Sequence, residues 1–124
     1  MAKIVVADDD VDVRMLVALK LKYSGHDVVE VGDGAAAVET CRSERPDLVV
    51  LDLMMPVMSG LEACRSIKAD PELAGVPVVL LTARAQNTDV DAGLAVGADA
   101  YVTKPFSPKE LAARVESLLE GSGR

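Results

Sequence analysis

Short apolar runs alternate along this chain with longer segments in which apolar residues recur every three or four positions. Three of the runs are apolar without alternation, which is typical of strands covered on both faces. The other two carry polar or charged residues, so we expect them at the edges of a sheet. The five predicted strands are Ile4–Ala7, Asp27–Val31, Leu48–Asp52, Val76–Thr82 and Ala100–Thr103.

The segments between the runs have the spacing of amphipathic helices. The apolar residues predicted to share one face are Val13, Leu16, Val17 and Leu21 in the first helix and Leu111, Val115, Leu118 and Leu119 in the last. Gly25 is expected just after the first helix, and Ser107 and Pro108 are expected to open the last one. The helices predicted between them are Asp33–Arg45, Gly60–Ala69 and Asn87–Ala95.

This alternation predicts an α/β fold, in which a doubly wound parallel five-stranded sheet has helices on both faces and right-handed crossovers. We expect one domain over residues 1–120, with residues 121–124 as a flexible tail or the start of a linker. In such sheets, ligands bind beyond the carboxyl ends of the strands. Polar residues at those ends are therefore the candidates for function.

Composition narrows the possible functions. Acidic residues outnumber basic ones by 20 to 13, and basic residues form no run, which argues against a domain that binds nucleic acid directly. Cys41 and Cys64 stand in no metal-binding or redox spacing, so we interpret them as reduced, packed thiols. No apolar stretch approaches the roughly 20 residues of a membrane helix. We expect a cytoplasmic protein that does not enter the membrane.

Polar residues stand at the strand ends that a parallel sheet brings to one edge. They are Asp8, Asp9 and Asp10 after the first strand, Asp52 at the end of the third, Thr82 at the end of the fourth and Lys104 after the fifth. Crowded carboxylates repel one another, and a hard cation such as Mg²⁺, or Mn²⁺ in its place, relieves that repulsion. An ionised Asp52 could then attack a phosphorus centre whose charge the metal and Lys104 neutralise.

Two further polar residues have simpler interpretations. Asp10 directly precedes the first helix, where a carboxylate caps the helix and favours its dipole. His26 lies in a predicted turn between Gly25 and Asp27, and we expect an exposed imidazole there.

Five groups of residues occur in order and at consistent spacing. They are Ile4 to Asp10, Leu51-Asp52 followed by Met54-Met55-Pro56 and Gly60, Leu81 to Arg84, Gly97 to Tyr101, and Lys104-Pro105-Phe106. Together they resemble the receiver domain of two-component response regulators over essentially the whole chain. The resemblance implies a flavodoxin-like (βα)5 fold with strand order 2-1-3-4-5.

The resemblance also implies a role for each matching residue. Asp52 is expected to be the phosphoacceptor, with Thr82 and Lys104 contacting the phosphoryl oxygens. Mg²⁺ is expected to be bound by Asp9, Asp52 and the Met54 backbone carbonyl directly and by Asp8 through water. Thr82 and Tyr101 are expected to form the switch, Met54 and Arg84 to tune the hydrolysis rate, and the peptide bond before Pro105 to be cis.

The function implied is a signalling switch that catalyses only its own phosphorylation and dephosphorylation. A sensor histidine kinase or phosphotransfer protein supplies the phosphoryl group, and a remodelled face formed by the fourth helix, the fifth strand and the fifth helix controls an effector protein or domain. Two alternatives stay open. One is a receiver that binds partners without phosphorylation, and the other is a phosphatase of the haloacid-dehalogenase type with Asp8 as the nucleophile.

The sequence leaves the larger assembly less defined. We favour a stand-alone receiver over one cut from a longer regulator, because the numbering begins at Met1 and the chain stops after a helix. Asp99, Glu110 and Arg114 match charges with which one branch of the family dimerises, but Ala100 replaces an acid of that pattern. We therefore expect a monomer.

Overall fold

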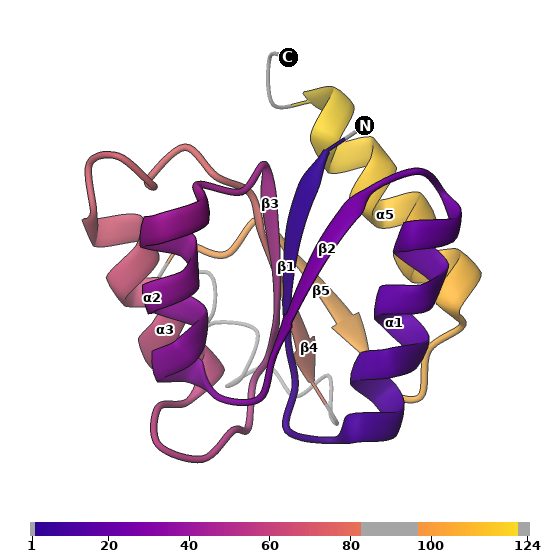
Figure 1. Ribbon diagram of the computed structural model, residues 1–124, viewed down its shortest axis with the longest axis horizontal. Helices are drawn as coiled ribbons and strands as arrows, with labels where there is room; N and C mark the ends of the chain where they lie inside the picture. Colours follow the sequence, from indigo (N-terminus) through magenta and orange to yellow (C-terminus); the bar gives the residue numbers. More distant parts are fainter. Residues whose placement is uncertain (1, 83–96, 122–124) are drawn as a thin grey trace.

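The computed structural model describes residues 2–82 and 97–121, and it contains one five-stranded sheet with helices on both sides (Figure 1). The strands are β1 (Lys3–Ala7), β2 (Asp27–Val31), β3 (Leu48–Asp52), β4 (Val78–Thr82) and β5 (Ala100–Thr103). The described helices are α1 (Val11–Tyr23), α2 (Gly34–Glu44), α3 (Gly60–Ala69) and α5 (Pro108–Gly121). The predicted helix Asn87–Ala95 lies outside the described residues.

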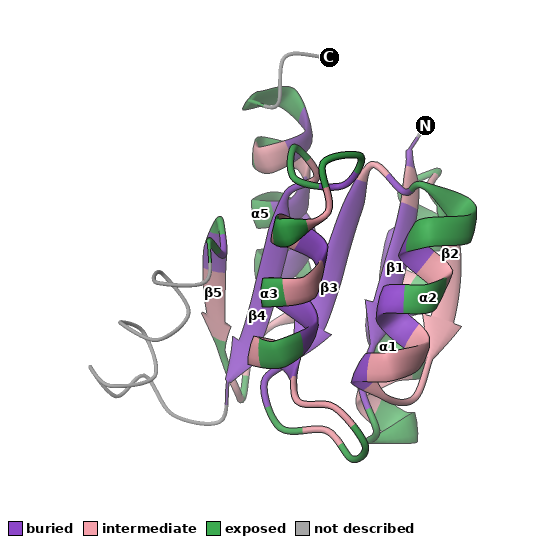
Figure 2. Cartoon of the chain, turned by 90° about the vertical axis from the view of Figure 1, so that its left-hand side faces the viewer, coloured by how far each residue is buried: buried purple, intermediate pink, exposed green. Residues whose placement is uncertain are grey.

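The sheet is parallel throughout, with the order β2-β1-β3-β4-β5, so the predicted flavodoxin-like topology is confirmed. Every residue of β3 and β4 is buried, whereas β2 and β5 at the two edges are mostly half-buried (Figure 2). This difference is the physical reason for the sequence pattern, because only a strand covered on both faces and both sides needs to be apolar at every position.

Two apolar layers hold the helices on the sheet. On one face, alternate strand residues such as Val5, Val49 and Leu80 pack with α2 and α3. On the other face, their neighbours pack with α1 and α5, in which Val17, Leu21, Leu111, Val115 and Leu119 are buried. The two layers fix all the described strands in one register, and so they bring the carboxyl ends of β1, β3, β4 and β5 to one edge.

The residues predicted to flank α1 and to open α5 are confirmed, whereas the predicted helix Asp33–Arg45 runs from Gly34 to Glu44. The Asp10 carboxylate caps α1 by accepting hydrogen bonds from the backbone N–H groups of Asp12 and Val13. Gly25 follows α1 with a φ of 95°, in the left-handed region that glycine adopts easily. The Ser107 hydroxyl accepts a hydrogen bond from the backbone N–H of Glu110 at the start of α5.

Three local predictions were wrong. β4 begins at Val78 and not at Val76, because Pro77 has no N–H to donate to a strand ladder. Leu16 was assigned to the buried face of the first helix, but half of it is exposed. His26 was expected to be exposed, but only 7% of its side chain is accessible, because it packs between the start of β1 and α5.

A search of the described helices finds none with the length and apolar character needed to cross a membrane.

Candidate functional site

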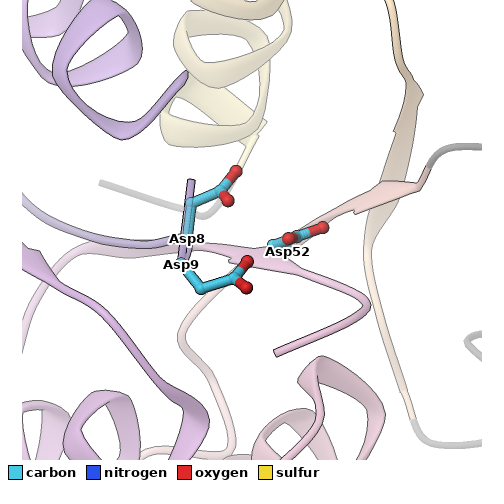
Figure 3. Close-up of side chains that lie close together, drawn as sticks. All are labelled: Asp8, Asp9 and Asp52. Carbon is cyan, nitrogen blue, oxygen red and sulfur yellow. The ribbon is translucent and has the colours of Figure 1, made fainter. Parts of the chain in front are cut away.

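Three carboxylates meet at the carboxyl edge of the sheet (Figure 3). Asp8 and Asp9 follow β1, and Asp52 is the last residue of the neighbouring strand β3. Their carboxylate oxygens lie within 4.8 Å of one another. Asp8 and Asp52 are buried and Asp9 is exposed, so the cluster is open to solvent on the Asp9 side.

Lys104 brings the opposite charge to this cluster. Its Nζ lies 3.1 Å from Asp8 Oδ2 and 3.4 Å from Asp52 Oδ1. The backbone N–H of Lys104 donates to the Thr82 carbonyl at 2.7 Å, which ties the end of β5 to the end of β4. The Lys104–Pro105 peptide bond is cis. The ammonium therefore reaches both buried acids from the far side of β4.

Asp8 has a partner at each of its polar groups. Its Oδ1 accepts from the backbone N–H of Asp10 at 2.9 Å, while Oδ2 accepts from Lys104. Its backbone N–H donates to the Val31 carbonyl, and its carbonyl accepts from Arg14 Nη1 at 3.1 Å. Asp8 is therefore held in place before any cation arrives.

Burial raises the pKa of Asp52 to about 7, and the adjacent Asp8 carboxylate acts in the same direction while Lys104 opposes both. Burial lowers the pKa of the Lys104 ammonium, but Asp52 and Asp8 raise it by more, so its pKa lies above the ordinary value. A cation bound between the carboxylates would favour the ionised form of Asp52. An acid with a perturbed pKa beside a specific charged partner is a candidate for chemistry.

The chain turns sharply after Asp52 and returns along its own backbone. The backbone N–H of Gly60, the first residue of α3, donates to the Leu53 carbonyl at 2.9 Å. A Cβ built on Gly60 would lie 2.2 Å from the Asp52 carbonyl oxygen, so only glycine fits there. The loop between them carries Val57 at a φ of 68°, which is unusual for a β-branched residue. This packing positions the end of β3.

The remaining predicted residues lie around this cluster. Thr82 is buried at the end of β4, beside β3. Tyr101 on β5 is half-buried and packs against the apolar layer that includes α2 and α3. The Met54 side chain is 73% exposed beside the site. Arg84 lies outside the described residues.

Asp99 has an intramolecular role. Its Oδ2 lies 3.0 Å from Lys68 Nζ and accepts from the backbone N–H of Val78 at 2.8 Å. A carboxylate that already joins α3 to the start of β4 is a weaker candidate for pairing with a second copy of the chain. The expected monomer stays a prediction.

Sequence reasoning missed Arg14. Its side chain lies along the Asp8 backbone and reaches Glu30 of β2, with 3.5 Å between Arg14 Nε and Glu30 Oε1. The available signal was a basic residue four positions after Asp10, one helical turn above an acidic loop.

The donor set suits a hard cation. Three carboxylates at this spacing, one open to solvent, leave room for the waters or phosphate oxygens that Mg²⁺ retains. The ammonium of Lys104 lies beside Asp8 and Asp52 and could pair with a further anionic group. The predicted residues at this carboxyl edge are therefore Asp8, Asp9, Asp52, Thr82 and Lys104, whereas Tyr101 lies within β5 opposite Leu80 and Arg84 lies outside the described residues.

Comparison with known proteins agrees with this arrangement. The family model described as the response regulator receiver domain matches residues 4–116. The DNA-binding response regulator MtrA of Mycolicibacterium smegmatis is 48% identical over 117 residues, which cover 94% of this chain and 50% of that protein. The chain thus spans about half the length of the curated relatives it matches.

Solved structures show the same likeness. The signal receiver domain of a histidine kinase from Syntrophus aciditrophicus has a TM-score of 0.92 and 35% identity, covering all of this chain and 94% of that one. The receiver domain of sensor histidine kinase PA1611 from Pseudomonas aeruginosa has a TM-score of 0.89 and 29% identity, covering 96% and 98% of the two chains. In that structure a magnesium ion is coordinated in the active site cleft.

Proposed function

This chain belongs to the response regulator receiver family of two-component signal transduction, and on that basis we propose that it accepts a phosphoryl group from phosphohistidine onto Asp52 in a Mg²⁺-dependent reaction. One observation carries the proposal most directly. Lys104 contacts both Asp8 and Asp52 at the carboxyl edge of the sheet, so a nucleophile, a candidate metal ligand and a cation meet at one point.

The proposed metal ligands are Asp9, Asp52 and the Met54 carbonyl, with Asp8 acting through water. The contacts of Asp8 support its indirect role, because both of its carboxylate oxygens already accept hydrogen bonds. When bound, Mg²⁺ supplies positive charge that neutralises the transferring phosphoryl group and favours ionised Asp52. Mn²⁺ would serve in the same place.

The transfer itself is a displacement at phosphorus. An Asp52 carboxylate oxygen forms the new O–P bond as the N–P bond of the phosphohistidine breaks, and the leaving imidazole keeps the electron pair and takes up a proton. Lys104 and the Thr82 hydroxyl hold the phosphoryl oxygens. Water later attacks the phosphorus, releases inorganic phosphate and restores the carboxylate. Met54 is proposed to tune the rate of this hydrolysis, and so is Arg84, which lies outside the described residues.

Phosphorylation then adds negative charge and acceptor oxygens at the edge of the sheet. Thr82 is drawn toward the new group and Tyr101 changes its burial, which remodels the face that includes β5 and α5. The position of Tyr101 supports this role, since the residue is half-buried on the edge strand β5 and packs against one apolar layer.

The proposed partners are a histidine kinase or phosphotransfer protein upstream and an effector protein or domain downstream. The chain itself is proposed to be a cytoplasmic switch that contacts neither nucleic acid nor membrane. The relatives named DNA-binding response regulators are about twice as long, so an output joined to this receiver and an output on a separate protein are both compatible with the comparison.

The decisive experiment is intact-mass spectrometry after treatment with acetyl phosphate, with and without Mg²⁺, on the wild type and on Asp52→Asn. We expect one phosphoryl adduct on the wild type, none without Mg²⁺ and none on the variant. Borohydride reduction converts a phosphorylated aspartate to homoserine, and tandem mass spectrometry then locates it.

Each other outcome selects an alternative. Homoserine at position 8 would favour the haloacid-dehalogenase-type phosphatase. A wild type that binds Mg²⁺ but forms no adduct, with acetyl phosphate or with a phosphohistidine donor, would favour a receiver that acts without phosphorylation.

A further inference from the structure

The Asp9 carboxylate points toward Asp52, but nothing in the described part of the chain holds it there by a hydrogen bond or ion pair (Figure 3). Asp9 is exposed, whereas Asp8 and Asp52 are buried. Its direction is therefore set by the backbone from which it departs. Because a peptide unit is planar, fixing the Asp8 carbonyl also fixes the plane that carries the Asp9 nitrogen.

Arg14 fixes that carbonyl. Its Nη1 donates to the Asp8 carbonyl oxygen at 3.1 Å, across the first turn of α1. Among the hydrogen bonds of the described residues, this is the one that a side chain donates to the backbone of Asp8, Asp9 and Asp10. The other contacts of Asp8 hold its carboxylate and its N–H, so they leave the carbonyl to Arg14.

The Arg14 guanidinium also has a partner on its other side, Glu30 of β2. Its Nε lies 3.5 Å from Glu30 Oε1, which makes an ion pair, although this buried nitrogen has no hydrogen bond of normal geometry. Glu30 is braced in turn by Lys22, whose Nζ lies 3.6 Å from Glu30 Oε2. Gly32 leaves room for the guanidinium, since a Cβ built there would lie 3.2 Å from Nη1.

We propose that Arg14 is a positioning residue for the metal site, acting through the Asp8 carbonyl to aim the Asp9 carboxylate. The inference rests on the proposed function, because it assigns Arg14 to the assembly of that same site. Groups that orient metal ligands in this way commonly change metal affinity by about 10- to 100-fold.

The sign of the effect separates positioning from simple charge. A cation near three carboxylates repels Mg²⁺, so removing its charge alone would tighten metal binding. Positioning predicts the opposite. Arg14→Met is therefore expected to weaken binding of Mg²⁺ and Mn²⁺ by about tenfold.

The test is direct titration of the metal-free full chain with Mg²⁺ and with Mn²⁺, by calorimetry and by the Mn²⁺ electron paramagnetic resonance signal. The matched control is Lys20→Met, which removes the same charge from the same helix at a residue that forms no ion pair with Asp8 or Glu30 among the described residues. Gly32→Ala keeps Arg14 but crowds its guanidinium, and it is expected to weaken binding in the same direction. Thermal melts in chelator establish that each variant is folded.

The rate of phosphorylation by acetyl phosphate gives a second readout. For Arg14→Met, the Mg²⁺ concentration giving half-maximal rate is expected to rise about tenfold, while the rate at saturating Mg²⁺ stays within about twofold of the wild type. For Arg14→Lys, which keeps the charge, this Mg²⁺ concentration is expected to lie between the values of the wild type and Arg14→Met.

Unchanged or tighter metal binding by folded Arg14→Met overturns the inference, and so does an equal loss in Lys20→Met. If Arg14→Met does not fold, Gly32→Ala is the deciding variant. Metal binding by Gly32→Ala as tight as that of the wild type also overturns the inference. A wild type that binds no metal contradicts the proposed function itself, and this outcome is visible before any variant is compared.

Discussion

At the scale of single residues, the site is held together by charges that offset one another before any metal binds. Lys104 contacts Asp8 and Asp52, which burial has removed from water. Without that ammonium, two buried carboxylates would face each other across an apolar edge, at considerable cost in free energy. The pKa of Asp52, raised to about 7, reports the part of the cost that Lys104 does not remove.

That raised pKa has a consequence for stability. In the unfolded chain the Asp52 carboxyl loses its proton near pH 4 (about 3.9), whereas in the folded chain it keeps the proton to about pH 7. The folded state binds more protons across this range, so this group makes stability fall as pH rises from about 4 to about 7. Asp52→Asn lacks the titration and is expected to be more stable than the wild type at pH 7.5, by roughly 1–3 kcal/mol.

Urea denaturation of both proteins in chelator at pH values from 4 to 8 measures the difference. All other carboxylates are common to the two proteins, so the difference in unfolding free energy is expected to grow with pH and level off above about pH 7.5. A difference that does not depend on pH would mean that Asp52 has an ordinary pKa in the folded chain.

At the scale of secondary-structure elements, the start of α3 is built against the end of β3. A Cβ on Gly60 would meet only backbone among its nearest atoms, with the Asp52 carbonyl oxygen at 2.2 Å and the Leu53 Cα at 2.9 Å. Gly34 at the start of α2 has a similar relation to the Met58 carbonyl, at 2.1 Å. The starts of α2 and α3 thus pack tightly against the loop that follows Asp52. The atoms in contact belong to the backbone, which cannot shift as easily as a flexible side chain.

Gly60→Ala is therefore expected to lower the free energy of unfolding by about 1–3 kcal/mol or more, because the loop must move to make room. The same movement displaces Asp52 and is expected to slow phosphorylation by acetyl phosphate. Gly75→Ala is the matched control, since a methyl group at that position would meet no atom within 4 Å and its backbone conformation is not left-handed. Equal stability of the two variants in urea would contradict the tight packing of Gly60 against the end of β3.

At the scale of the whole molecule, His26 joins segments that are far apart in the sequence. Its Nδ1 accepts from the backbone N–H of Ala2 at 3.1 Å, so its Nε2 carries the proton and donates to Glu116 of α5. The residue thereby connects the start of β1 and the entry to β2 with the last helix, which lies on the same face of the sheet as α1 (Figure 1).

His26→Leu is expected to cost about 1–3 kcal/mol in unfolding free energy, because the buried N–H of Ala2 loses its acceptor and Glu116 loses its donor. Glu116→Gln keeps an oxygen that accepts from Nε2 and is expected to lose less. Denaturant unfolding of the two variants measures both values. A smaller loss in His26→Leu than in Glu116→Gln would show that the histidine does not carry the connection.

The sequence allowed the fold and most of the site to be predicted because both depend on local pattern. Leu48 to Leu51 are apolar without interruption and Asp52 follows them, so a parallel sheet had to place that carboxylate at its edge. The burial of His26 had no such pattern, since it depends on Glu116, 90 positions away. Arg14 escaped prediction because its one sequence signal, a basic residue one helical turn after Asp10, does not show that its partners are a main-chain carbonyl and an edge strand.

The contacts of His26 with Ala2 and Glu116 also show where the start of β1 and the last turns of α5 lie. Ala2 and the last turns of α5 meet at the amino-terminal edge of the sheet, while the acidic cluster lies at the opposite edge. The five residues of β1 separate the two edges by roughly 15 Å. A domain or a fluorescent probe attached beyond α5 would therefore start at the edge of the sheet opposite Asp52, and the proposed phosphoryl group would influence it through the elements that lie between the two edges.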